Sequence, residues 1–201
     1  NTDKGISGEL VMDILGKING KKLAYDKTKI NEIAIKGELS VLKVDGKIKW
    51  YDSDPIYGSG FVGGIKCFFP SISSGIDSRI QFGSVNDYKY WYVDALAKIS
   101  PPIPAFPGTA IHGFGGGAYH HMSQSTFQPT SIAGFSTKND NTSIGTSNSG
   151  VVYKPDINVG LGLKGTMIVG LTAKQIFNAD VTLEANFEKD GGLNQISLNG
   201  N

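Results

Sequence analysis

Alternation of apolar and polar side chains with a period of two residues recurs along almost the whole chain, whereas helical periodicity is hard to find. Such alternation is typical of half-buried strands, because successive side chains of a strand point to opposite faces. Turn signals separate about ten or more such segments, at the spacing expected of sandwiches or barrels. We therefore predict an all-β fold of mostly antiparallel sheets, sandwich-like or barrel-like, with little helix.

Four turns are predicted from short polar and glycine-containing sequences. The strongest signal is Asp45-Gly46 between two β-rich runs, because this dipeptide favours the positive φ angles of a two-residue hairpin. It predicts a hairpin over residues 38–51. Further turns are predicted at Asn19-Gly20, at Asn86-Asp87 and near Asp190-Gly191-Gly192.

The charges are unevenly distributed along the chain. We expect a single domain over 1–201, because neither flank of the polar stretch 139–150 closes a core of its own. Residues 99–137 carry no Asp, Glu, Lys or Arg and include all three histidines. Within them, four prolines make residues 100–108 a rigid extended connector. Residues 139–150 are small and polar, which predicts an exposed, mobile loop.

Composition excludes several classes of protein. The formal net charge is +1, and Arg79 is the single arginine, whereas nucleic-acid binders usually have a basic surplus that includes arginine. Cys67 is the only cysteine, so neither an internal disulfide nor a cysteine-based zinc site is expected. The chain shows no leader-like start and no apolar run of membrane-helix length.

Two pairs of residues are candidate metal ligands. If the chain reverses at residues 115–117, His112 faces His120 and both imidazoles could bind one transition metal. In one straight strand the two histidines would instead lie about 26 Å apart, and hydrogen-bonded or solvated histidines are the alternative. Asp52 and Asp54 could bind calcium through hard oxygen ligands, or could simply initiate a turn. No resident cofactor is otherwise expected.

A row of tyrosines is a candidate ligand-binding surface. Tyr88, Tyr90 and Tyr92 share one face of a predicted strand, and with Trp50 they could stack against a sugar or a peptide. The alternative is that the opposite face, with Trp91, belongs to the core and that the tyrosines form its amphipathic rim.

The sequence gives no argument for catalysis. It contains neither a nucleophile-elbow motif nor a zinc-binding His-Glu-x-x-His helix, and its five glutamates lie in runs typical of solvated strand faces. We therefore expect a protein that is not an enzyme, and a hydrolase ranks last among the alternatives.

Two segments resemble parts of known proteins. Residues 82–94, FGSVNDYKYWYVD, and residues 113–119, GFGGGAY, are similar to segments of very large, uncharacterised bacterial proteins that are modular and surface-associated. The resemblance implies that the chain is one module of a larger protein. It assigns no functional residue.

Three functions follow as hypotheses. The first is a structural or protein-interaction module of a bacterial extracellular or cell-surface assembly, with other modules or copies of itself as partners. The second is a carbohydrate-binding or other ligand-binding β-sandwich, assisted by calcium. The third is an outer-membrane β-barrel, although lysines at 43, 47 and 49 and at 17, 21 and 22 would interrupt its apolar band and make a membrane partner less expected.

Overall fold

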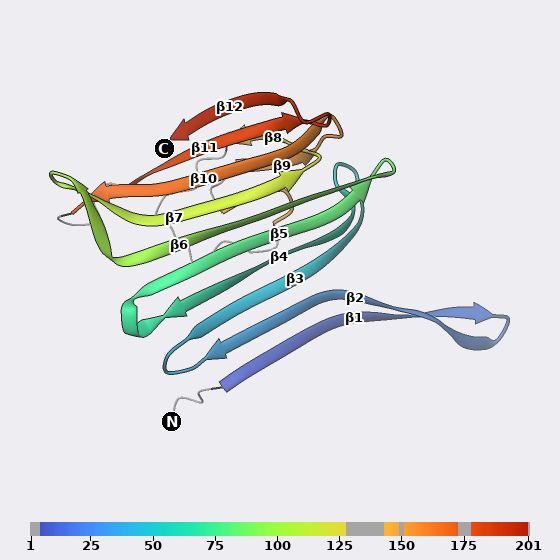
Figure 1. The fold of residues 1–201 in the computed structure, drawn as a ribbon. Helices are drawn as coiled ribbons and strands as arrows, with labels where there is room; N and C mark the ends of the chain where they lie inside the picture. Colours follow the sequence, from blue (N-terminus) through green and yellow to red (C-terminus); the bar gives the residue numbers. More distant parts are fainter. Residues whose placement is uncertain (1–4, 128–142, 149–150, 173–177, 201) are drawn as a thin grey trace.

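The computed structural model describes residues 5–127, 143–148, 151–172 and 178–200. Ten strands form one antiparallel sheet, and β8 and β9 form a separate two-stranded sheet (Figure 1). The all-β, antiparallel prediction is therefore confirmed. The strands are β1 (Gly5–Asn19), β2 (Lys22–Glu38), β3 (Lys43–Asp54), β4 (Gly58–Phe69), β5 (Ser74–Val85), β6 (Tyr88–Phe106), β7 (Thr109–His120), β8 (Met122–Phe127), β9 (Val151–Pro155), β10 (Val159–Leu171), β11 (Asn178–Glu188) and β12 (Leu193–Gly200).

The large sheet is a meander in which neighbouring strands are nearly always consecutive in the sequence. The exception is the pair β7 and β10, which are hydrogen-bonded neighbours although residues 121–158 separate them. The described parts of this connection include β8, β9 and residues 143–148, and they pack on one face of the sheet. We call this the inner face and the opposite side the outer face.

The core lies between the inner face and this connection, and it is built largely of tyrosine. Tyr90, Tyr92 and Tyr119 from the sheet are almost fully buried together with Tyr153 from β9. Their rings make tilted contacts, with centroids 4.8 Å apart for Tyr119 and Tyr153. The remaining buried members of the core are Tyr57, Met122, Val151 and Val159.

Three of the predicted turns are confirmed. Asn86 and Asp87 join β5 to β6 with φ angles of 47° and 66°, the left-handed conformations that a two-residue hairpin requires. Gly20, at the β1–β2 turn, and Gly191, between β11 and β12, also have positive φ.

The Asp45-Gly46 hairpin prediction is wrong, because both residues lie inside β3 and the chain reverses at residues 39–42 instead. Asp45 lies opposite Lys36 of β2 and Lys66 of β4. A carboxylate between two lysines favours the extended strand, and Gly46 packs closely beneath Ile35.

Two predicted irregular segments also differ from expectation. Residues 100–106 are extended but continue β6, whose ladder with β7 breaks after Lys98 and resumes at Ile103. Within the predicted exposed loop, Gly145 and Ser147 are buried, because the backbone of residues 143–148 is hydrogen-bonded to the inner face. The rest of the predicted loop, 139–142 and 149–150, lies outside the described residues.

Helical structure is confined, in the described residues, to one 3-10 turn at Pro70–Ile72. None of the described helices has the length and hydropathy of a membrane-spanning helix.

The tyrosine core predicts sensitivity to alkali. Burial raises the pKa of Tyr57 to about 12 and also raises the pKa values of Tyr90, Tyr92, Tyr119 and Tyr153. The unfolded chain has tyrosine pKa values of about 10, so it releases these protons first as the pH rises. We expect the contribution of these tyrosines to the free energy of unfolding to be constant below pH 10 and to fall steadily above it.

Denaturant titrations at several pH values, followed by tyrosinate absorbance, measure this effect. Ionisation of the core tyrosines well before the loss of β-sheet circular dichroism would contradict it.

Candidate functional site: the two faces of the sheet

The outer face carries three consecutive cross-strand rows that are almost entirely apolar. Each row takes one residue from each of the ten strands and contains no charged residue, and Ser78 is the only polar member. The first row is Leu10, Ile33, Ile48, Gly63, Ile80, Val93, Ala118, Leu163, Ala185 and Ile196; the second is Gly8, Ile35, Gly46, Ile65, Ser78, Ala95, Gly116, Gly165, Leu183 and Leu198; the third is Ile6, Gly37, Val44, Cys67, Ile76, Ala97, Phe114, Met167, Val181 and Gly200.

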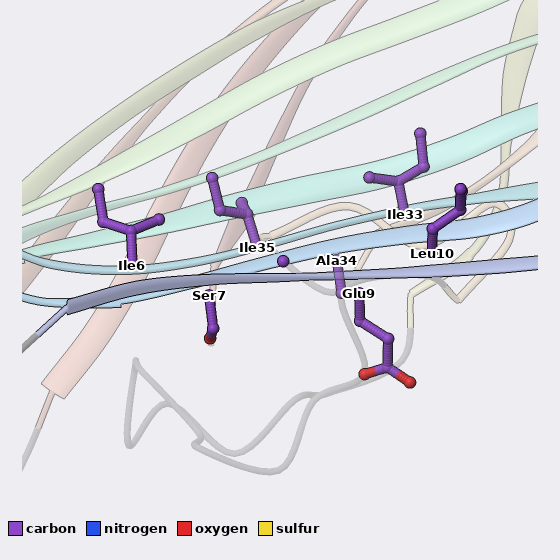
Figure 2. Close-up of a pocket in the computed structure, with 8 residues that line it drawn as sticks. Ile6, Ser7, Glu9, Leu10, Ile33, Ala34 and Ile35 are labelled. Atoms are coloured by element: carbon purple, nitrogen blue, oxygen red, sulfur yellow. The ribbon is translucent and has the colours of Figure 1, made fainter. Parts of the chain in front are cut away.

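This face is open to its surroundings. Ile65, Leu163 and Leu198 are 41%, 46% and 70% exposed, so no described segment of the chain covers the rows. Figure 2 shows the division at the β1 edge, where Ile6 and Leu10 point to one side of the sheet and Ser7 and Glu9 to the other. At about 4.8 Å between strands and 6.6 Å between alternate residues, three rows of ten cover about 950 Å². Soluble monomers rarely expose an apolar patch larger than a few hundred Å².

An aromatic row borders the apolar rows at one end of the strands. Trp50, Phe61, Phe82, Trp91 and His120 are directly opposite one another in register across β3 to β7. Successive ring centroids lie 6.3, 5.2, 6.4 and 6.3 Å apart. The aromatic row therefore forms a continuous band along one margin of the apolar surface.

The predicted tyrosine platform does not exist as a surface. Tyr90 and Tyr92 lie in the inner core, and Tyr88 packs partly buried against it, whereas Trp50 lies on the outer face. The alternative interpretation is inverted as well, because the face of Trp91 is the open one. Both faces of β6 carry aromatic residues, so alternation alone did not identify the core face.

The inner face is polar, and it contains a buried ion pair that spans three strands. Lys164 of β10 donates to Asp94 of β6 across 2.7 Å, and both side chains are almost fully buried. Gly117 of β7 lies between them in register. A Cβ at this glycine would lie 2.7 Å from the Cβ of Asp94 and 2.8 Å from the Cε of Lys164, so only glycine leaves room for the pair.

A buried carboxylate on β11 organises the neighbouring part of the inner face. Glu184 is 2% exposed, and it accepts hydrogen bonds from the hydroxyls of Tyr119, at 2.5 Å, and Tyr153, at 2.9 Å. The Tyr119 ring reaches Glu184 by crossing Gly162, where a Cβ would overlap the ring. Glycine again lets a long side chain cross a strand, and the two tyrosines satisfy both carboxylate oxygens.

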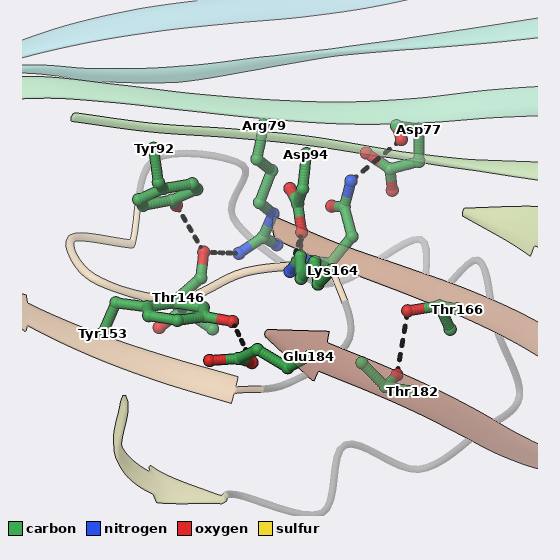
Figure 3. Close-up of polar contacts among 11 residues, drawn as sticks. Asp77, Arg79, Tyr92, Asp94, Thr146, Tyr153, Lys164, Thr166, Thr182 and Glu184 are labelled. Atoms are coloured by element: carbon green, nitrogen blue, oxygen red, sulfur yellow. Dashed lines mark hydrogen bonds and ion pairs between the residues drawn. The ribbon is translucent and has the colours of Figure 1, made fainter. Parts of the chain in front are cut away.

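Residues 143–148 are held against the inner face by hydrogen bonds. The carbonyl of Thr146 accepts from Arg79 Nη1 at 3.0 Å and from the Tyr92 hydroxyl at 2.7 Å (Figure 3). The amide of Gly145 donates to Gln81, and that of Asn148 donates to Asp94. The segment therefore lies over β5 and β6 and is hydrogen-bonded to side chains of both strands.

Sequence reasoning missed Arg79, Asp94, Lys164 and Glu184 as members of one cluster. Asp94 shares the parity of Tyr90 and Tyr92 in a strand, which was an available signal for a polar group in the core. Its partner Lys164 is distant in the sequence, so no local pattern joins the two.

The predicted histidine site is not formed. The chain does not reverse at residues 115–117, because β7 runs without interruption from Thr109 to His120 and places His112 and His120 near its two ends. His120 stacks on Trp91, and Nδ1 of the neighbouring His121 donates a hydrogen bond to the Lys89 carbonyl. Within the described ranges, no three His, Cys, Asp or Glu side chains are close enough to hold a metal ion.

Asp52 and Asp54 stabilise a turn. Asp54 accepts hydrogen bonds from the amides of Ile56 and Tyr57, at 2.9 and 2.8 Å. Asp52 accepts from Ser59, and this hydrogen bond lowers the pKa of the Asp52 carboxyl, with Lys29 contributing. The geometry matches the turn interpretation of this pair, and the two carboxylates have different partners.

Comparison of the chain with protein-family models, with curated proteins and with solved structures finds no match.

The glycine beneath the buried ion pair provides a paired test of the inner face. We expect Gly117→Ala to lower the free energy of unfolding by about 1–3 kcal/mol, because the added methyl group displaces Lys164 and Asp94. Gly165→Ala is the matched control, since this glycine lies beside Gly116 on the outer face and a Cβ there would meet no atom within 4 Å. We expect that change to stay within about 0.5 kcal/mol.

Urea unfolding followed by tryptophan fluorescence compares the two variants. If the Gly117 variant and the control variant lose the same free energy of unfolding, the inner-face contacts do not require a glycine at position 117.

Proposed function

We propose that the chain forms the wall of a strand-built membrane protein, in which the outer face contacts lipid and the inner face surrounds a polar interior. The observation that carries this proposal is the set of three apolar rows, which crosses all ten strands without a charge. Of the three hypotheses from the sequence, this one is the outer-membrane β-barrel. It corresponds to a location at the bacterial cell surface.

The lengths of the strands support the proposal. Six residue steps separate Trp50 from Val44 along β3, which is about 20 Å of strand at 3.3 Å per residue and about 15 Å of height at a barrel tilt of about 40°. Membrane barrels have an apolar band about 25 Å tall and strands of about 9–11 residues in the membrane. β4, β5 and β7 each have 12 residues, which is enough to cross such a band. The aromatic row corresponds to an interfacial girdle, where aromatic rings are enriched.

The lysines that counted against a membrane protein lie elsewhere. Lys47 and Lys49 alternate with the outer-face residues Ile48 and Trp50, so they belong to the inner face. Lys43 has the same parity and is paired with Glu38. Lysines 17, 21 and 22 lie in the end of the β1–β2 hairpin that extends beyond the apolar rows.

A soluble interaction module is the competing hypothesis, because a protein partner could also cover the outer face. Non-obligate interfaces are only about as apolar as the rest of a protein surface and have a polar rim. The apolar rows contain no charged residue, even in the edge strands β1 and β12, so contact with lipid explains them better than contact with a protein partner does. Carbohydrate binding has less support, since its predicted tyrosines are buried.

The two tryptophans test the proposal without any substitution. Trp50 and Trp91 are the only tryptophans, and both belong to the aromatic row. In vesicles of phosphatidylethanolamine and phosphatidylglycerol, we expect brominated lipids to quench their fluorescence, more strongly with bromine near the headgroup than at the acyl terminus. A protein that stays in solution without detergent, and whose tryptophans are not quenched, would overturn the proposal.

A single charge placed on the outer face provides the second test. Ile65 lies in the second of the apolar rows, and Ile72 is a comparably exposed isoleucine in the 3-10 turn. In a membrane, Ile65→Arg should cost about 2–4 kcal/mol if it lies near the midplane, because arginine is desolvated there. Ile72→Arg should have little effect.

Unfolding in lipid vesicles measures both variants. In a soluble protein both arginines would face water, so two equally small effects would favour the soluble module.

A further inference from the structure

The sheet has two free edges. In the part of the chain that the structure describes, β1 pairs only with β2 and β12 pairs only with β11. In hydrocarbon, unpaired backbone amides and carbonyls cost several kcal/mol each, so a membrane sheet cannot leave its edges open. The apolar rows nevertheless extend to both edge strands.

The β1–β2 hairpin is longer than the rest of the sheet requires. The ladder between β2 and β3 stops at Glu32, whereas β1 and β2 remain paired as far as Asn19 and Lys22. Figure 1 shows this part of the hairpin projecting beyond the neighbouring strands. We call residues 12–19 of β1 the projecting half of β1.

The projecting half keeps an apolar outer face. Its register with β2 shifts twice, between Val11 and Met12 and between Leu15 and Gly16. Each shift inserts one unpaired residue into β2, so β1 alternates without a break and the paired residues of β2 keep their faces on either side of each insertion. As a result, Ile14 and Ile18 point to the same side as Leu10 and are 72% and 75% exposed.

Closing a sheet requires a stagger between its first and last strands. Ten antiparallel strands are an even number, so β1 and β12 run antiparallel to each other and can be neighbours. On the assumption that the proposed membrane function is correct, we propose that the free edge of β12 pairs with the projecting half of β1 in the same chain. The projecting hairpin then provides the stagger.

The faces of the two strands are compatible with this pairing. On β12, Ile196 and Leu198 belong to the apolar rows, and Ser197 lies opposite Glu184 on the inner face. On the projecting half, Ile14 and Ile18 face outward and the intervening Lys17 faces inward. The pairing therefore continues both the apolar surface and the polar interior.

The filling of the inner face favours the same chain over a second copy. Residues 143–148 and β9 already cover the inner face of β5, β6 and β7. A barrel of about eight strands is just filled by its side chains, so ten strands have room for such a segment. A barrel made of several copies would enclose a much wider interior. Residues 143–148 and β9 of each copy would cover only part of its inner surface.

Cysteine cross-linking in a Cys67→Ser background tests the pairing. One series combines Leu198→Cys with Ile14→Cys, Gly16→Cys or Ile18→Cys. The matched series combines Leu198→Cys with Ile6→Cys, Gly8→Cys or Leu10→Cys, which have the same parity without the stagger. Because a disulfide requires Cα atoms within about 7 Å, only correctly paired positions should oxidise in the vesicle-reconstituted protein.

We expect a cross-linked monomer, with loss of the reduced monomer band in gel electrophoresis, in the first series only. Cross-links in the second series, cross-links only between copies, or no cross-link in either series would each overturn the pairing. Tryptophan quenching in the same samples separates the two proposals. Cross-linked monomer without lipid quenching would refute the membrane function alone, and quenching without cross-linked monomer would refute the pairing alone.

Discussion

Strand register is the constraint on which every feature of this molecule depends. The two faces of the sheet have opposite chemistry, so a shift of one residue would place Lys47 and Asp94 outside and Ile48 and Val93 inside. The sequence opposes such a slip at each strand pair, because apolar and polar residues alternate on both partners. The two irregularities between β1 and β2 also respect this rule, since each restores the alternation after the inserted residue.

Glycine allows the inner face to form a network across strands. Lys164 reaches Asp94 over Gly117, and Tyr119 reaches toward Glu184 over Gly162. Desolvation makes a buried ion pair costly unless further hydrogen bonds satisfy it. Asp94 meets that condition at one oxygen only: Oδ2 accepts a second hydrogen bond from the Asn148 amide, whereas Oδ1 is buried and has no hydrogen-bond partner among the described residues. The connection between β7 and β10 thus contributes directly to the electrostatics of the sheet.

Local patterns predicted the class of the fold and three of its turns, because alternation and turn chemistry are properties of neighbouring residues. Asn86-Asp87 was predicted on this basis and forms the expected turn. Asp45-Gly46 was mispredicted because the lysines that hold Asp45 in a strand come from β2 and β4. The candidate binding surfaces were harder to predict. Alternation with a period of two separates the two faces of β6, and both carry aromatic residues, but it does not indicate which face packs against protein and which is open.

Residues 121–158 leave the ten-stranded sheet after β7 and return to it at β10, and their described parts pack on its inner face. All other neighbouring strands of the ten-stranded sheet are joined by short connections, which close quickly and at small entropic cost. Within that sheet, only β7 and β10 must find each other across a long stretch of chain, and lengthening such a stretch adds little further cost. The sequence of this one connection can therefore diverge in evolution while the ten-stranded sheet stays the same, so related chains can share the sheet and differ in what covers its inner face.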